Sequence, residues 1–138
     1  MKRMILFALL GGLSLTAPAQ TAEDSQVRVR GYQIELPVNP VPLHRIDVTK
    51  YKGGYSLANG EELFVGQSGR HLYATVGGRP AKELVASRLN EFVSLDRELK
   101  ISLDIDDLGD ASGYILMVVP GQGSQASLVQ ASRLVSSR

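Results

Sequence analysis

The clearest pattern in the sequence is the alternation of apolar and polar residues over short stretches from residue 55 onward. Within 99–105, Leu99, Ile101, Leu103 and Ile105 alternate with polar residues, which is typical of a strand with one buried face. Turn residues rich in glycine, asparagine and aspartate separate this stretch from its neighbours. The pattern predicts a mainly β chain folded as an antiparallel β-meander. The later strands are expected at 83–87, 91–95, 99–105 and 114–119.

The turn at Asn59-Gly60 fixes the first hairpin through the faces of its flanking residues. A two-residue loop would place an apolar side chain opposite a polar one. A three-residue loop, 58–60, with Gly60 in the left-handed region instead places Tyr55 opposite Leu63. We therefore predict the three-residue loop, with both residues on one apolar face.

The next hairpin contains the most conspicuous aromatic pair of the sequence. A two-residue loop at 68–69 would place Val65 opposite Leu72 and, on the other face, Phe64 opposite Tyr73. An aromatic pair on an open sheet face suits a protein partner or an apolar ligand. The alternative is that residues 27–36 or the C-terminal residues cover it. Tyr55, Leu63, Leu72 and Leu103 are expected to share one core.

The regions on either side of the meander have weaker patterns. Residues 27–36 alternate in part and favour a strand, and the three prolines within 37–42 predict a stiff, extended connector. Residues 47–52 are expected to form one helical turn with Asp47 as its cap. For residues 122–138 two interpretations stay open, a short helix over 127–135 or a frayed tail.

Several segments of the meander match a known pattern of turns and core positions, namely GYSLANG (54–60), LFV (63–65), RHLYA (70–74), EL (83–84), FVSLD (92–96) and SGY (112–114). In these segments the chain resembles a small, exported, lipocalin-like bacterial β-meander family of unknown function. Similar modules are appended to secreted serine-hydrolase and peptidase domains. The resemblance covers roughly residues 51–119, and its motifs are turns, glycines and core positions. It implies a partly closed, lipocalin-like barrel or a strongly curved sheet, and it implies no activity.

The N-terminus has the pattern of a secretory signal. Lys2 and Arg3 precede an apolar run at 4–15, and Ala17-Pro18-Ala19 supplies small residues at the positions that a signal peptidase reads. The run is shorter than the roughly 20 residues that span a bilayer, although a short membrane anchor is the alternative. We expect an exported, periplasmic protein, or an extracellular one, with no stable membrane insertion after cleavage. The predicted parts are a signal peptide (1–19), an extended segment with a proline-rich linker (20–42), the β-meander (43–120) and a C-terminal tail (121–138).

Composition narrows the classes of partner. The chain has 15 basic and 14 acidic residues, and removal of Lys2 and Arg3 leaves it close to neutral. Nucleic-acid-binding proteins usually carry a basic excess, so we expect no nucleic-acid partner. The chain has no cysteine, so an exported domain of this size has to rely on one hydrophobic core rather than on disulfides.

The sequence contains few residues that could form a metal or cofactor site. With His44, His71 and no cysteine, a zinc site would need carboxylates at a spacing that the sequence does not show. Asp104, Asp106 and Asp110 suggest weak calcium binding, but Leu108 occupies a position where a hand-type loop needs an oxygen ligand. A solvated hairpin turn is the preferred interpretation. We expect no metal and no cofactor.

Catalytic patterns are equally weak, which favours a protein that is not an enzyme. Ser68 lies in Gly66-Gln67-Ser68-Gly69, whose second glycine comes one position too early for a nucleophile elbow. Glu61 and Glu62 flank a turn, where acids are usually solvated. We therefore predict an exported, non-catalytic module that binds a small apolar ligand or an envelope protein through Phe64 and Tyr73. The alternatives are a structural envelope protein and an accessory to a secreted hydrolase.

Overall fold

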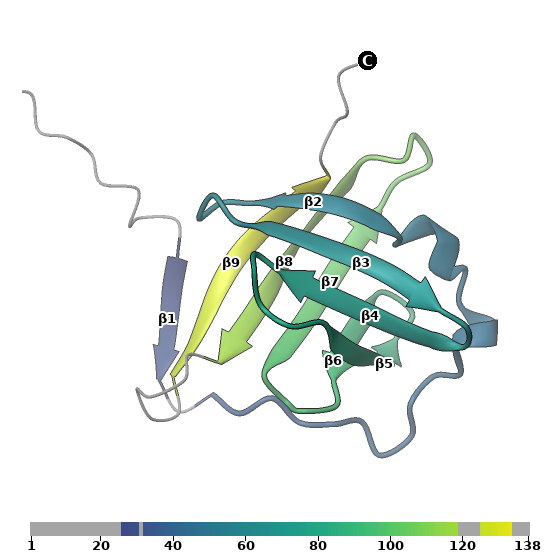
Figure 1. Ribbon diagram of the computed structural model, residues 1–138, viewed down its shortest axis with the longest axis horizontal. Helices are drawn as coiled ribbons and strands as arrows, with labels where there is room; N and C mark the ends of the chain where they lie inside the picture. Colours follow the sequence, from purple (N-terminus) through teal and green to yellow (C-terminus); the bar gives the residue numbers. More distant parts are fainter. Residues whose placement is uncertain (1–25, 31, 119–124, 134–138) are drawn as a thin grey trace, which may run out of the picture.

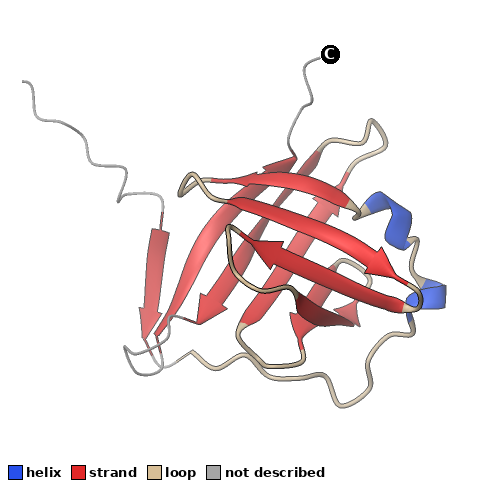
Figure 2. Ribbon diagram, viewed as in Figure 1, coloured by secondary structure: helices blue, strands red, loops and turns tan. Residues whose placement is uncertain are grey.

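The computed structural model describes residues 26–30, 32–118 and 125–133. The predicted signal peptide lies outside the described residues. Within the described residues, nine strands form one antiparallel sheet in which neighbours along the chain pair from β2 to β9 (Figures 1 and 2). The strands are β1 (Gln26–Arg30), β2 (Gly53–Leu57), β3 (Glu62–Ser68), β4 (His71–Val76), β5 (Lys82–Arg88), β6 (Glu91–Ser94), β7 (Leu99–Ile105), β8 (Ala111–Val118) and β9 (Gln125–Arg133).

The sheet closes on itself through its last strand. β9 pairs with β8 along its length and with β2 through three residue pairs, from Tyr55↔Arg133 to Leu57↔Ala131. The result is a closed, eight-stranded antiparallel barrel, so the predicted fold class is confirmed. The first half of β9 extends past the end of β2, and β1 pairs with it there.

The expectation of a helix or a frayed tail after residue 121 was wrong, because residues 125–133 form a strand. Val129 and Ala131 face the interior, whereas Ala126 lies in a second apolar cluster on the outer surface. A strand with small apolar residues on both faces lacks the simple alternation that marks a half-buried strand. Of the described residues in the predicted stretch 27–36, residues 27–30 belong to a strand, β1, and residues 32–36 do not.

The two predicted hairpin registers had different outcomes. Tyr55 lies opposite Leu63, and Gly60 has φ +84°, as the three-residue loop requires. The second register was wrong by two residues, because Ser68 pairs with His71 and the loop is Gly69-Arg70. A shift of two residues keeps every side chain on its predicted face, so pattern alone does not distinguish these registers.

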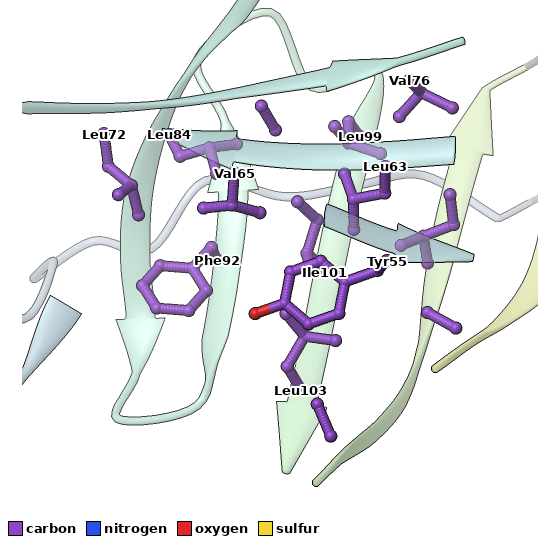
Figure 3. Close-up of a cluster of buried hydrophobic side chains, with 14 of the residues drawn as sticks. Tyr55, Leu63, Val65, Leu72, Val76, Leu84, Phe92, Leu99, Ile101 and Leu103 are labelled. Carbon is purple, nitrogen blue, oxygen red and sulfur yellow. The ribbon is translucent and has the colours of Figure 1, made fainter. Parts of the chain in front are cut away.

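Large apolar side chains fill the barrel. Tyr55, Leu63, Leu72 and Leu103 are each fully buried in one cluster, as predicted. Figure 3 shows these side chains converging on the space between the strands, with Phe92 and Ile101 beside Tyr55. The strands also approach closely at Gly113, where an added Cβ would lie 2.0 Å from the Ser102 carbonyl oxygen.

Two short 3-10 helices, η2 (Leu43–Arg45) and η3 (Val48–Lys50), lie at the end of the barrel where β2 begins (Figure 2). Ile46 between them is buried in the core cluster. The predicted helical turn at 47–52 is η3, and Asp47 occupies its N-cap position without a side-chain capping bond. The helices are attached through Tyr51, whose carbonyl accepts a hydrogen bond from the Tyr55 hydroxyl at 2.6 Å.

A second, smaller apolar cluster lies outside the barrel. Ile34 is buried against Val93, Leu116 and Ala126, and Tyr32 and Leu36 pack beside them. The N-terminal segment therefore covers the outer surface of β6, β8 and β9. This cover explains why β8 is apolar on both faces.

Candidate functional site

The barrel has a cavity of about 570 Å³ at the end opposite the two helices. This open end is where β1, β8 and the first half of β9 lie across from the β4–β5 turn. The volume is within the usual range for small-molecule sites in proteins. The lining residues are Arg28, Glu61, Val76, Arg79, Pro80, Ala81, Lys82, Asp96, Glu98, Leu99, Met117, Val118 and Ser127.

One wall of the cavity is a row of side chains set by strand register. Arg28 of β1 pairs with Ser127 of β9, Ser127 pairs with Met117 of β8, and Met117 pairs with Leu99 of β7. Paired residues in adjacent strands point to the same side of a sheet. The row therefore presents a guanidinium at one end and an apolar surface toward Leu99, which is buried.

Arg79, in the turn between β4 and β5, reaches across the cavity to the opposite wall. Its Nη1 lies 3.0 Å from Glu61 Oε1 and donates to the Val76 carbonyl at 3.5 Å. The same atom lies 3.8 Å from the Met117 sulfur. Half of the Arg79 side chain remains exposed to solvent, so the guanidinium bridges the opening without closing it.

Lys82 forms a separate charged group at the side of the cavity. Its Nζ donates to Asp96 and, at 2.6 Å, to Glu98. Burial alone would lower the pKa of Lys82, but these hydrogen bonds and the two negative charges outweigh it and raise the pKa. Because two carboxylates already surround its ammonium group, Lys82 is a poor candidate for binding a further anion.

The β6–β7 turn holds Asp96 in place. Ser94 is fully buried, and its hydroxyl donates to Asp96 Oδ1 at 2.6 Å while accepting from the Leu99 amide at 2.9 Å. Burial alone would raise the pKa of Asp96, but hydrogen bonds from Lys82, Ser94 and the Glu98 amide lower it. Asp96 therefore stays ionised and is committed to structure at neutral pH.

A second, shallower hollow of about 310 Å³ lies on the side of the barrel near the β3–β4 turn. Val41 pairs there with Ala86 of β5, so the proline-rich connector runs along this strand. His71 Nδ1 lies 2.6 Å from Glu83 Oε1 at its rim, and the His71 side chain is 59% exposed. This pair is an exposed ion pair or hydrogen bond on the outer surface of the barrel.

Phe64 and Tyr73 share the outer face, but they do not form the predicted pair. Phe64 lies opposite Thr75, and Tyr73 lies opposite Gly66. The Phe64 ring lies over Gly66, where an added Cβ would be 3.2 Å from its edge. Phe64 is 58% exposed. The N-terminal segment packs on β6, β8 and β9 instead, so it does not cover Phe64.

The three acids of the alternative calcium interpretation, Asp104, Asp106 and Asp110, are not grouped as a metal site within the described residues. Asp106 Oδ1 accepts hydrogen bonds from the Leu108 and Asp110 amides at 2.9 and 2.8 Å and thereby caps the β7–β8 turn. Asp104 accepts from Asn90 at 2.8 Å, away from that cap. Within residues 26–30, 32–118 and 125–133, no three histidine, cysteine or acidic side chains are grouped so that they could hold a metal ion.

The other candidate residues are dispersed as well. His44 is exposed in η2, far along the chain from His71. Glu61 contacts Arg79 and Asn59, whereas its neighbour Glu62 is exposed on the other face of β3. The cavity was not predicted, because the residues that line it come from separate strands and turns, including a strand that was not predicted. The signal that was present in the sequence is the pair of basic residues in Arg79-Pro80-Ala81-Lys82, directly before the strand expected at 83–87.

Comparison with known proteins gave no relative: no family model, no curated protein and no solved structure matches this chain. Among the described residues, no helix is long and apolar enough to cross a membrane.

Proposed function

We propose that this protein is an exported, non-catalytic binding protein that takes a small, largely apolar ligand in the cavity at the open end of the barrel. One observation carries the proposal: the interior is filled, yet one end retains a cavity of about 570 Å³ with an apolar floor and a charged rim. The ligand site therefore lies at the mouth of the barrel and not at its centre.

The lining chemistry supports binding rather than catalysis. Val76, Leu99 and Met117 supply the apolar floor, on which an apolar ligand gains free energy by leaving water. Asp96 and Glu98 line the cavity and are both bound to Lys82, and the third lining acid, Glu61, is paired with Arg79. Each of these carboxylates therefore already serves as the partner of a cationic side chain.

Filling the cavity tests the proposal. Ala81 is exposed and lines the cavity, so Ala81→Trp should occupy the space while leaving the core intact. We expect the protein to bind an apolar fluorescent naphthalene probe, with about a tenfold or greater loss of affinity in Ala81→Trp. Leu108→Trp is the matched control, because Leu108 is 89% exposed on a turn at the other end. Equal affinity in the two variants would show that the probe binds elsewhere.

A protein partner on the outer face is the second candidate function, and the exposure of Phe64 favours it. Large exposed aromatic side chains are common at the centres of protein interfaces. In a pull-down from cell envelope, the double variant Phe64→Ser, Tyr73→Ser should lose any partner that wild type retains, whereas Ala81→Trp should keep it. Unchanged capture by the double variant would rule out this surface.

A further inference from the structure

The cationic side chains that line the cavity differ in how many of their donor groups already have a partner. Lys82 lies between two carboxylates. The contacts of Arg79 with Glu61, Val76 and Met117 all use Nη1, so its Nε and Nη2 lie outside these contacts. Arg28 makes no ion pair within the part of the chain that the structure describes. Arg28 and Arg79 are thus the cations available to a ligand.

These two arginines approach the same part of the cavity from different walls. Arg28 and Met117 lie two strands apart in one register row, with Ser127 between them. Adjacent strands are about 4.8 Å apart, so the two Cα atoms are separated by roughly 10 Å. Arg79 Nη1 contacts the Met117 sulfur, and Arg28 lines the same cavity. A ligand group placed between the two guanidinium groups therefore lies within reach of both.

Two guanidinium groups beside an apolar surface match one kind of molecule. A carboxylate accepts charge-assisted hydrogen bonds from arginine, often two from one side chain. Val76, Leu99 and Met117 lie next to the arginines and would pack against a hydrocarbon chain.

We propose that the ligand is a single-chain amphiphile with a carboxylate head, held between Arg28 and Arg79 while its chain lies on this apolar floor. This inference rests on the proposed function, because it names the ligand class for the same cavity.

Calorimetric titration with probes that share one chain length tests the ligand class. Decanoate, decanol and decyltrimethylammonium are compared below their micelle-forming concentrations. We expect decanoate to bind about tenfold more tightly than decanol, and the cationic probe to bind weakest. Arg28→Gln and Arg79→Gln should each remove most of the preference for decanoate and leave decanol affinity unchanged. Arg88→Gln, which changes an exposed arginine outside the cavity, should behave as wild type.

The outcomes separate this inference from the function on which it rests. If decanoate and decanol bind equally well and Ala81→Trp abolishes both, the carboxylate class is wrong and the cavity remains a binding site. If neither probe binds, the proposed function itself fails. If the preference for decanoate survives in Arg28→Gln, Arg79→Gln, the two arginines do not form the head-group site. Vesicles with anionic phospholipids are tested separately. Binding to these vesicles without binding to decanoate would show that the two arginines bind a membrane surface instead of a free carboxylate.

Discussion

The two ends of the barrel are lined by different kinds of side chain. At one end, η2 and η3 cover the core with Ile46 and Tyr51, and aromatic contacts and hydrogen bonds fix them to the strands. At the other end, side chains with charged groups surround a cavity of about 570 Å³. The same interior is therefore sealed by apolar packing on one side and bounded by ion pairs on the other. An ion pair near solvent contributes little to stability, so the open end can change its contacts without unfolding the barrel.

The difference between the ends should appear most strongly when one buried or half-buried side chain is shortened. Phe92 is 1% exposed and packs edge-to-face on Tyr51, with ring centroids 5.1 Å apart. Phe92→Ala should lower the free energy of unfolding by about 3–5 kcal/mol, because it removes apolar contacts and leaves a void. Met117→Ala, at the half-buried wall of the cavity, should cost about 1 kcal/mol or less. Urea unfolding of both variants measures this, and equal losses would contradict the contrast.

A smaller effect should follow from loosening the helices by removing one hydroxyl group while keeping the aromatic ring in the core. The Tyr55 hydroxyl donates to the Tyr51 carbonyl, so Tyr55→Phe leaves that acceptor without its partner. We expect a loss of about 1–2 kcal/mol, together with faster amide hydrogen exchange in residues 43–51 than at the open end. Tyr73→Phe on the outer face is the control and should change stability by about half a kcal/mol or less. Exchange that rises equally at both ends would argue against a local attachment.

The smallest effect should be a difference in acid sensitivity. Burial alone would raise the pKa of Glu91, but hydrogen bonds from Ser87 and Lys100 and the positive charges of Lys100 and Arg88 lower it below 4.5. A carboxyl group whose pKa is lower in the folded than in the unfolded protein stabilises the fold at pH values above the unfolded-state pKa. This stabilisation is lost as the pH falls through the folded-state pKa. Between about pH 7 and about pH 3, wild type should lose up to about 1 kcal/mol more than Glu91→Gln. Parallel pH profiles would show that the ion pair has no net effect.

The sequence predicted the parts of the fold that depend on local alternation. The strand at 99–105 and the Tyr55–Leu63 pairing follow from side-chain faces that have one consistent solution. The Phe64–Tyr73 pairing failed because two registers that differ by two residues bury the same face. The strand at 125–133 was missed because Ala126 and Leu128 pack under the N-terminal segment, a contact that no local pattern reveals.

The candidate site was less accessible to sequence analysis than the fold. Arg28 and Met117 lie far apart in the sequence, and their proximity depends on β9 lying between β1 and β8. Without that strand, Arg79 and Lys82 are simply the charged residues of an exposed turn. Phe64 and Tyr73 were easier to recognise from the sequence than the cavity, because both lie in one predicted hairpin.

Closure through β9 also determines the order in which this chain can fold. The hairpins from β2 to β8 join neighbours along the sequence and need only short loops to close. The three pairs between β2 and β9 join residues from opposite ends of the barrel sequence, and long-range pairings of this kind form slowly. Until they form, β2 and the part of β9 that pairs with it have unpaired edges that can recruit another chain. The final strand therefore governs the interval during which the folding intermediate is prone to aggregate.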